Sequence, residues 1–146
     1  MKTMAIMTGI QGSGKSEFCK RHLSSYERIN LDTLHTRNKE NIALNDAVSK
    51  NMDIVIDNTD PDIQSRKKYI DIAKENGYYI VGYFMQSRIK DCIERNNQRE
   101  GKARVSDVAI VSTSNKLQMP SYDEGFDELY YVSIKDNDFL VEKWRE

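Results

Sequence analysis

The stretch Gly9-Ile10-Gln11-Gly12-Ser13-Gly14-Lys15-Ser16 decides the fold of this chain. It fits the spacing G-x-x-x-x-G-K-[ST] without a gap, and it follows the apolar run 4–8 and opens a segment of helical character, 16–24. A glycine-rich turn between a strand and a helix lets backbone N–H groups close around phosphate oxygens, and the helix N-terminus adds partial positive charge. We therefore predict a phosphate-binding loop (P-loop). The alternative, an ordinary glycine-rich turn, is disfavoured by the spacing and by this context.

The motif also predicts a role for each of its side chains. Lys15 is expected to bridge the β- and γ-phosphates of ATP, and Ser16 to supply a ligand to Mg²⁺. ATP and Mg²⁺ are therefore the expected cofactors. The loop residues predicted to bind the nucleotide are Gly9, Gln11, Gly12, Ser13, Gly14, Lys15 and Ser16.

Outward from the loop, strand patterns alternate with helix patterns. Strands are expected at 4–8, 28–31, 53–57, 78–85 and 128–134, and helices at 16–24, 33–51, 60–76, 89–99 and 106–118, followed by a short C-terminal helix. Asp60 is the expected N-cap of the helix 60–76, with Pro61 at the first helical position. This order predicts an α/β fold of the three-layer P-loop NTPase type, with a mainly parallel sheet of about five strands and helices on both faces.

Composition limits the class of protein. With 146 residues the chain is predicted to form one domain, 1–146, and its net charge of -1 gives no general case for wrapping a long nucleic acid, although binding a strand end needs few cations. No stretch approaches the roughly 20 apolar residues of a membrane span, so a cytoplasmic protein is expected. Cys19 and Cys92 are interpreted as reduced structural thiols.

Motifs that are missing narrow the P-loop class. A GTPase carries N-K-x-D, whereas residues 115–118 read Asn-Lys-Leu-Gln, and an ATPase typically ends its second motif in Asp-Glu, whereas Asp57 precedes Asn58. A small kinase remains. Asp57 ends a predicted strand at the edge where ligands of such sheets bind, so we expect it to accept a hydrogen bond from Ser16, hold a magnesium water or orient the acceptor. The alternative is a turn residue.

A kinase also needs a base for the acceptor hydroxyl and cations over the transferred phosphate. Asp32, just after the second strand, is the candidate base, and the alternative is a helix N-cap. Arg95 and Arg99 share one helix face in the basic segment 88–104, which we interpret as an arginine lid, against the alternative of a solvated helix face. The basic residues of this segment are Arg88, Lys90, Arg95, Arg99, Lys102 and Arg104. The cluster Arg66-Lys67-Lys68 is interpreted as solvated surface.

These pieces, in their order, resemble the 5′-kinase module of polynucleotide kinases, both the phage enzyme and the kinase half of the eukaryotic polynucleotide kinase 3′-phosphatase. The matching pieces are GSGKS at 12–16, INLDTL at 29–34, IDNTDPD at 56–62 followed by Ser65-Arg66, RNNQRE at 95–100, VSD at 105–107 and P-x-x-x-E-G-F at 120–126. They cover nearly the whole chain.

The resemblance implies an ATP-dependent kinase of nucleic-acid repair that acts on the 5′-OH end of DNA or RNA. Asp32 falls on the family's general base for the 5′-hydroxyl, and Arg95 and Arg99 fall in the lid, with Arg99 as the transition-state arginine. Asp57 and Thr59 lie on the segment that lines the acceptor side. Ser16 and Asp57 are the implied metal residues.

One departure keeps other functions open. The phage enzyme has an arginine three residues after its general base, where this chain has His35, with Arg37 as an alternative contact to the acceptor's phosphate. A small-molecule kinase acting on a nucleoside, sugar or antibiotic is therefore the enzyme alternative, and a non-catalytic ATP-binding module is the non-enzyme alternative. The motif D-x-D-x-[TV] of the family's phosphatase domains is absent from the sequence, so a kinase without phosphatase activity is expected.

Overall fold

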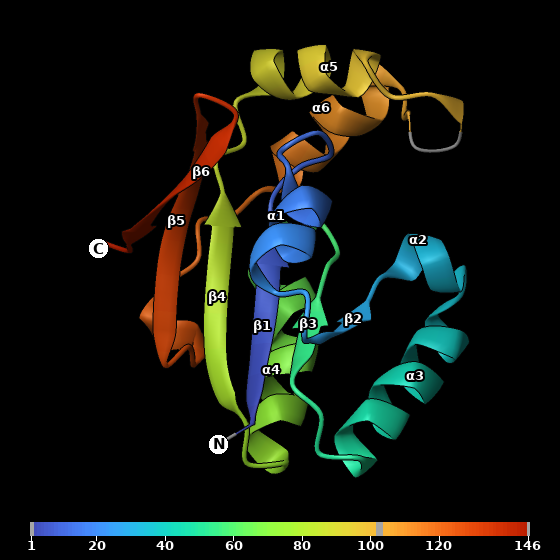
Figure 1. Ribbon diagram of the computed structural model, residues 1–146, viewed down its shortest axis with the longest axis vertical. Helices are drawn as coiled ribbons and strands as arrows, with labels where there is room; N and C mark the ends of the chain where they lie inside the picture. The colour runs from blue at the N-terminus through green and yellow to red at the C-terminus, as the bar shows by residue number, and fades with distance from the viewer. Residues whose placement is uncertain (1, 102–103, 146) are drawn as a thin grey trace.

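A computed structural model describes residues 2–101 and 104–145 of the chain (Figure 1). Within these residues, six strands form one sheet in the order β2-β3-β1-β4-β5-β6. The strands are β1 (Thr3–Thr8), β2 (Glu27–Ile29), β3 (Ile54–Ile56), β4 (Tyr79–Met85), β5 (Glu128–Lys135) and β6 (Asp138–Lys143). The first five run parallel, and β6 pairs antiparallel with β5.

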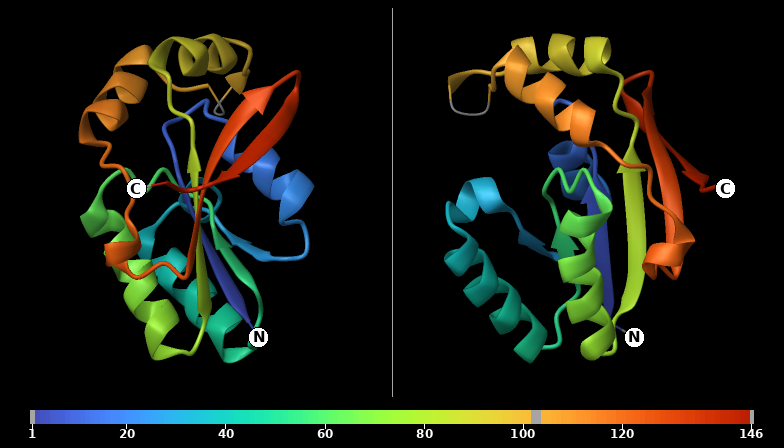
Figure 2. Two further views of the ribbon diagram at one scale, coloured as in Figure 1. Left: turned by 90° about the vertical axis from the view of Figure 1, so that its left-hand side faces the viewer. Right: turned by 180° about the vertical axis from the view of Figure 1, so that it is seen from behind.

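The central strand β1 is buried on both faces, as its continuous apolar run predicts. Met4 and Ile6 belong to the core under α3 (Arg37–Ser49) and α4 (Ile63–Glu75). Ala5 and Met7 belong to the core under α1 (Lys15–His22), which covers the opposite face (Figures 1 and 2). The structure thus confirms the predicted three layers with helices on both faces.

Three further helices lie at the carboxyl end of the parallel strands (Figures 1 and 2). α5 (Ile89–Asn97) and α6 (Asp107–Lys116) pack together above the P-loop, and Ile10 of the loop is buried with Cys92 and Ile110 from these helices. α2 (Leu31–Leu34) follows β2 at the same end. The P-loop therefore lies between α2 and the α5–α6 pair.

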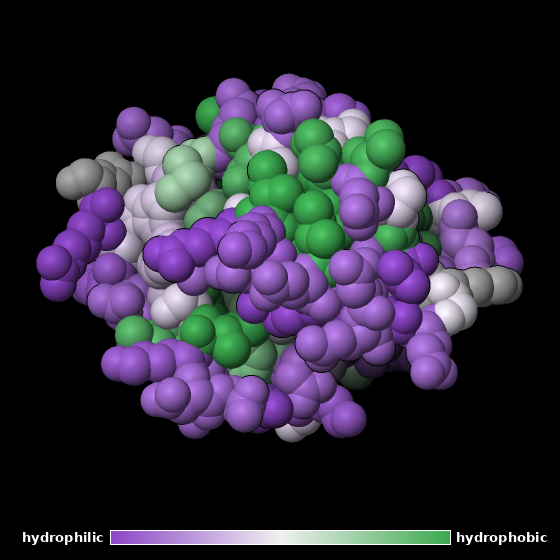
Figure 3. Space-filling model, turned by 90° about the horizontal axis from the view of Figure 1, so that it is seen from above, coloured by the Kyte–Doolittle hydropathy of each residue, from purple (hydrophilic) through white to green (hydrophobic). Residues whose placement is uncertain are grey.

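When the molecule is seen from above, apolar side chains gather in a larger area above the centre and in a smaller one below it, among otherwise polar groups (Figure 3). The exposed large apolar residues of α5 and α6 are Ile89, Val108 and Val111. Across 2–101 and 104–145, none of the helices combines the length and the apolar character that crossing a membrane requires.

The end of the chain differs from the sequence prediction. Residues 138–143 form strand β6 rather than a helix, so the sheet has six strands in place of about five. Asp136 and Asn137 have positive φ angles of 53° and 61°, which is the backbone of a tight hairpin turn that returns the chain antiparallel to β5.

Two helix boundaries also differ. Asp62, not Asp60, caps α4, because Asp62 and Ser65 satisfy each other's backbone N–H groups in a capping box. The helix expected at 33–51 is divided at His35, whose φ of 72° ends α2 before α3 begins at Arg37.

Arg66 is not solvated surface, and that prediction was wrong. Its side chain is fully buried and forms a salt bridge at 2.8 Å with Glu124, the last residue of the short helix η2 (Tyr122–Glu124). It also donates to the carbonyls of Asp60, Pro61 and Gln118. Lys67, in contrast, is exposed, as predicted.

Candidate active site

The P-loop connects β1 to α1 through two glycines with positive φ, 82° at Gly12 and 96° at Gly14. A Cβ at Gly12 would overlap the carbonyl oxygen of Cys92, so no larger residue fits without movement of the backbone. Gly14 is the N-cap of α1 and has no side chain to occupy the first N–H groups of the helix. These groups are therefore available to an anion at the helix N-terminus.

Lys15 begins α1 and points back into the loop. Its Nζ donates to the carbonyl of Ile10 at 3.1 Å. Burial lowers the pKa of Lys15, the Asp57 carboxylate opposes this shift, and the cation of Arg99 adds to it. Lys15 is thus close to both Asp57 and Arg99. This position suits a cation that contacts phosphate.

Ser16 and Asp57 form the hydrogen bond that the sequence predicted. The Ser16 hydroxyl donates to Asp57 Oδ2 at 3.1 Å, and Arg28 from β2 donates to the same oxygen through Nε at 2.7 Å. Asp57 is only 1% exposed, and its other oxygen, Oδ1, is buried with no hydrogen-bond partner in residues 2–101 and 104–145. An uncompensated carboxylate oxygen beside a hydroxyl is a suitable position for a cation.

Ser16 and Asp57 fit Mg²⁺ held jointly with nucleotide phosphates. Magnesium is usually bound through one or two carboxylates together with substrate phosphates rather than by a cage of protein groups. The part of the chain that the structure describes holds no group of three or more His, Cys, Asp or Glu residues arranged for a metal. Asp57 Oδ1 and Ser16 Oγ are the oxygens that this arrangement offers.

Asp32 is the second residue of α2, at the same end of the sheet as the P-loop, and its side chain is exposed. It is not the N-cap, because Asn30 caps α2 by accepting from the Thr33 N–H at 3.0 Å. Asn30 also donates to the Asp57 carbonyl at 2.6 Å. The Leu31 N–H donates to Asn58 Oδ1 at 2.9 Å. The end of β3 therefore fixes the helix that carries Asp32.

A buried polar network supports Asn58. Glu40 is fully buried and accepts from Asn58 Nδ2 at 2.9 Å and from the Tyr69 hydroxyl at 2.9 Å. Burial alone would raise the pKa of Glu40, but the hydrogen bonds from Tyr69 and Asn58 and the charge of Arg37 hold it below its usual value. Arg37 donates to both Glu40 and Tyr69 at 3.2 Å, whereas His35 is exposed after α2.

The two arginines of the predicted lid have different surroundings. Arg95 Nε donates to the Gly12 carbonyl at 2.6 Å, so α5 is joined directly to the P-loop. Arg99 is half-buried and near enough to Lys15 to lower its pKa. Arg88, Lys90 and Arg104 are exposed, and the predicted lid residue Lys102 lies outside the described residues.

Other predicted residues connect the loop to its surroundings. Gln11 Nε2 donates to the Thr113 hydroxyl of α6 at 3.0 Å, and the Gly9 N–H donates to the Thr59 carbonyl at 3.0 Å. The Ser13 hydroxyl is buried, with no hydrogen-bond partner among the described residues. The P-loop is thus held from both the α6 side and the segment after β3.

Sequence reasoning missed four residues near the site: Arg28, Glu40, Asn58 and Asp60. Asp60 is buried with a φ of 40°, and burial together with Glu40 raises its pKa well above the ordinary value, against the opposing effect of Arg66. Arg28 lies in a short strand and Glu40 in a largely polar helix, where a charged residue ordinarily indicates solvent. Asn58 and Asp60 stand inside the IDNTDPD stretch, which was the available signal.

These features define the P-loop kinase fold: a mainly parallel sheet with helices on both faces, the glycine loop that leads into α1, and Asp57, which follows β3 and accepts a hydrogen bond from Ser16. Residues 4–117 match the model of the family AAA_33, an AAA domain, and the chain belongs to this family.

Two curated relatives match nearly the whole chain. One is a putative bifunctional polynucleotide phosphatase/kinase from Acanthamoeba polyphaga mimivirus, 32% identical over 99% of this chain. The other is a bifunctional polynucleotide phosphatase/kinase from Schizosaccharomyces pombe, 32% identical over 98% of this chain. This chain spans 37% of the length of each relative.

A solved structure supports the fold alone. Kti12 from Chaetomium thermophilum, in complex with ADP-AlF3, superposes with a TM-score of 0.68 at 18% sequence identity. The match covers 91% of this chain and 90% of that one.

Proposed function

We propose that this chain is an ATP-dependent polynucleotide 5′-hydroxyl kinase that transfers the γ-phosphate of ATP to the 5′-OH end of DNA or RNA. The observation that carries the proposal is a match to a relative whose name includes polynucleotide phosphatase/kinase. The match covers 99% of this chain at 32% identity. The site supports it, because the P-loop, the acid Asp32 of α2 and an arginine of the predicted lid lie at one edge of the sheet.

In this proposal Asp32 is the general base. It accepts the proton of the 5′-hydroxyl while the hydroxyl oxygen attacks the γ-phosphorus in line with the leaving β–γ bridging oxygen. Asn30 and Asn58 orient α2 and so position this carboxylate. The exposure of Asp32 leaves room for the end of a strand.

The cations share the charge that develops on the phosphates. Lys15 contacts the β- and γ-phosphate oxygens, and Arg99 reaches the transferred group when the lid, 88–104, closes over the nucleotide. Bound through Ser16 and Asp57, magnesium would neutralise the same phosphates. Arg95 holds the lid helix against Gly12 and so places Arg99. Residues 1–146 act as one kinase domain.

Arg37 favours a second candidate function. Its guanidinium already donates to Glu40 and Tyr69, so His35, the C-cap of α2, is the other predicted contact for an acceptor phosphate. A neutral histidine gives a weaker contact than a free arginine. A P-loop kinase of small-molecule alcohols, which needs no such contact, is the alternative.

Competition between acceptors distinguishes the two functions. The protein would be incubated with γ-labelled ATP and Mg²⁺, with matched 5′-OH and 5′-phosphate oligonucleotides of DNA and RNA. We expect label on the 5′-OH ends alone, and no suppression by an excess of nucleosides or sugars. Transfer to a small alcohol that an oligonucleotide does not suppress would establish the alternative, and the absence of label on every nucleic-acid end would refute the proposal.

A further inference from the structure

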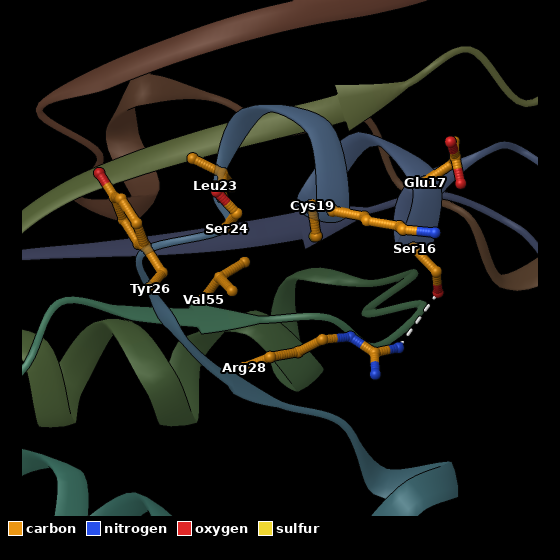
Figure 4. A pocket seen from close by; sticks show the side chains of 9 residues that line it. Ser16, Glu17, Cys19, Leu23, Ser24, Tyr26, Arg28 and Val55 are labelled. Carbon is orange, nitrogen blue, oxygen red and sulfur yellow. Dashed lines mark hydrogen bonds between the residues drawn. The ribbon is translucent and has the colours of Figure 1, made fainter.

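Arg28 makes an unusual contact for a residue on an edge strand. From β2 its Nε donates to Asp57 Oδ2 at 2.7 Å, and its Nη2 donates to the Ser16 hydroxyl at 3.2 Å. Figure 4 shows the guanidinium extending from β2 towards the Ser16 hydroxyl. One cation thus spans the two side chains that fit a magnesium ion.

The burial of the partners differs. The Asp57 side chain is 1% exposed, whereas the Arg28 side chain is 41% exposed. A buried carboxylate is costly without a cation nearby, so Asp57 needs one. Because Arg28 reaches Asp57 from the solvent side, its guanidinium regains hydration when it leaves, and departure costs less than it would for a buried arginine.

There is also space for the displaced side chain. A pocket of about 450 Å³ lies beside the contact, between α1 and β2, and both Ser16 and Arg28 line it (Figure 4). Its floor is apolar, with Cys19 and Val55, and it suits the methylene stem of an arginine. Glu17, which lines the same pocket, offers the displaced guanidinium a second carboxylate. Glu17 is paired with Arg21 at 2.9 Å in this structure.

We infer that Arg28 is an internal cation that competes with magnesium for the Ser16–Asp57 pair and thereby sets the metal affinity of the site. Arg28 contacts the Ser16 oxygen that the metal would use and binds the other oxygen, Oδ2, of the same carboxylate. Because a guanidinium and Mg²⁺ also repel each other, close contact of one with this pair opposes close contact of the other. Arg28 stabilises Asp57 until the metal–nucleotide complex displaces it into the pocket. This inference rests on the magnesium dependence of the proposed function, and it assigns Arg28 a positioning role, not a catalytic one.

Binding of Mn²⁺, followed by the electron paramagnetic resonance signal of the free ion, measures this competition without any reaction. The proteins would be wild type, Arg28→Gln, Arg28→Lys and the control Lys20→Gln, which removes an exposed cation from the same pocket. We expect Arg28→Gln to bind Mn²⁺ about tenfold more tightly, because a charge-assisted contact to a carboxylate is worth about this factor. Arg28→Lys should fall between, since lysine lacks the fork, and Lys20→Gln should match the wild type.

A double variant identifies the atom through which Arg28 acts. In the Asp57→Asn background, adding Arg28→Gln should give no gain in Mn²⁺ binding over Asp57→Asn alone, and melting curves of all variants would verify that each is folded. Equal or weaker Mn²⁺ binding by Arg28→Gln than by wild type would overturn the inference and leave the proposed kinase activity standing. If no variant bound Mn²⁺ even with a non-hydrolysable ATP analogue, both the inference and the metal requirement of the proposed function would be wrong.

Discussion

The buried pair of Arg66 and Glu124 should be a major determinant of stability. Their side chains are 0% and 6% exposed, and Arg66 donates to both oxygens of Glu124, at 2.8 and 3.2 Å, as well as to three backbone carbonyls. Arg66→Met leaves Glu124 buried without its cation and the carbonyls without a donor. Removing one partner of a buried pair costs about 3–5 kcal/mol, a large share of the about 5–15 kcal/mol that stabilises a domain.

Urea denaturation followed by circular dichroism measures this loss. We expect a drop of about 3–5 kcal/mol in the free energy of unfolding, with the melting temperature lower by about 10–15 °C. Lys67→Met is the matched control, because its salt bridge with Asp71 is 61% and 49% exposed and should contribute less than about 0.5 kcal/mol. Replacing both partners, with Arg66→Met and Glu124→Leu together, should restore only the part of the loss that comes from the uncompensated Glu124 carboxylate, because the three carbonyls still lack their donor. A loss below about 1 kcal/mol in Arg66→Met would refute the reasoning.

Three other changes test the site. Gly12→Ala places a methyl group against the Cys92 carbonyl at a φ of 82°, so it should cost about 1–3 kcal/mol of stability and weaken binding of a fluorescent ATP analogue; an unchanged protein would contradict the tight packing of the loop. Lys15→Ala should weaken binding of ATP more than binding of AMP in calorimetry, since the lysine contacts the outer phosphates, and equal losses would argue against that contact. Asp60→Asn should stabilise the protein at pH 7, because the raised pKa of Asp60 makes its ionisation unfavourable in the folded state. That advantage should vanish as pH falls below the ordinary Asp pKa of 3.8, and melting curves across pH that show a constant difference would contradict it.

The sequence predicted the central part of the fold because its signals there are local. The apolar run of β1, the glycines of the loop and the start of α1 each follow from neighbouring residues, and the Ser16–Asp57 hydrogen bond follows from the shared edge of parallel strands. The C-terminal strand β6 was missed because residues 138–143 lack a strict alternation, with β5 supplying the partner that makes them a strand.

Residues whose role depends on distant partners were also missed. Arg66 is buried only because Glu124, 58 positions later, returns beside it, and composition assigns such an arginine to the surface. Arg28 shows the same limit, since its partner Asp57 lies 29 positions away. Asp62 rather than Asp60 caps α4 because Ser65 completes a capping box with Asp62. Asp60 instead lies buried before the helix with a positive φ.

The central claim, that Asp32 of α2 activates a 5′-hydroxyl beside the P-loop, is tested most directly by one comparison. Label transfer from γ-labelled ATP to a 5′-OH oligonucleotide would be measured under single-turnover conditions for wild type and Asp32→Asn, with ATP binding measured in parallel. We predict transfer by the wild type, slowed by about 10²–10⁴-fold in the variant at unchanged ATP affinity. Transfer by Asp32→Asn within about threefold of the wild-type rate, far short of the effect of losing a general base, would contradict the claim.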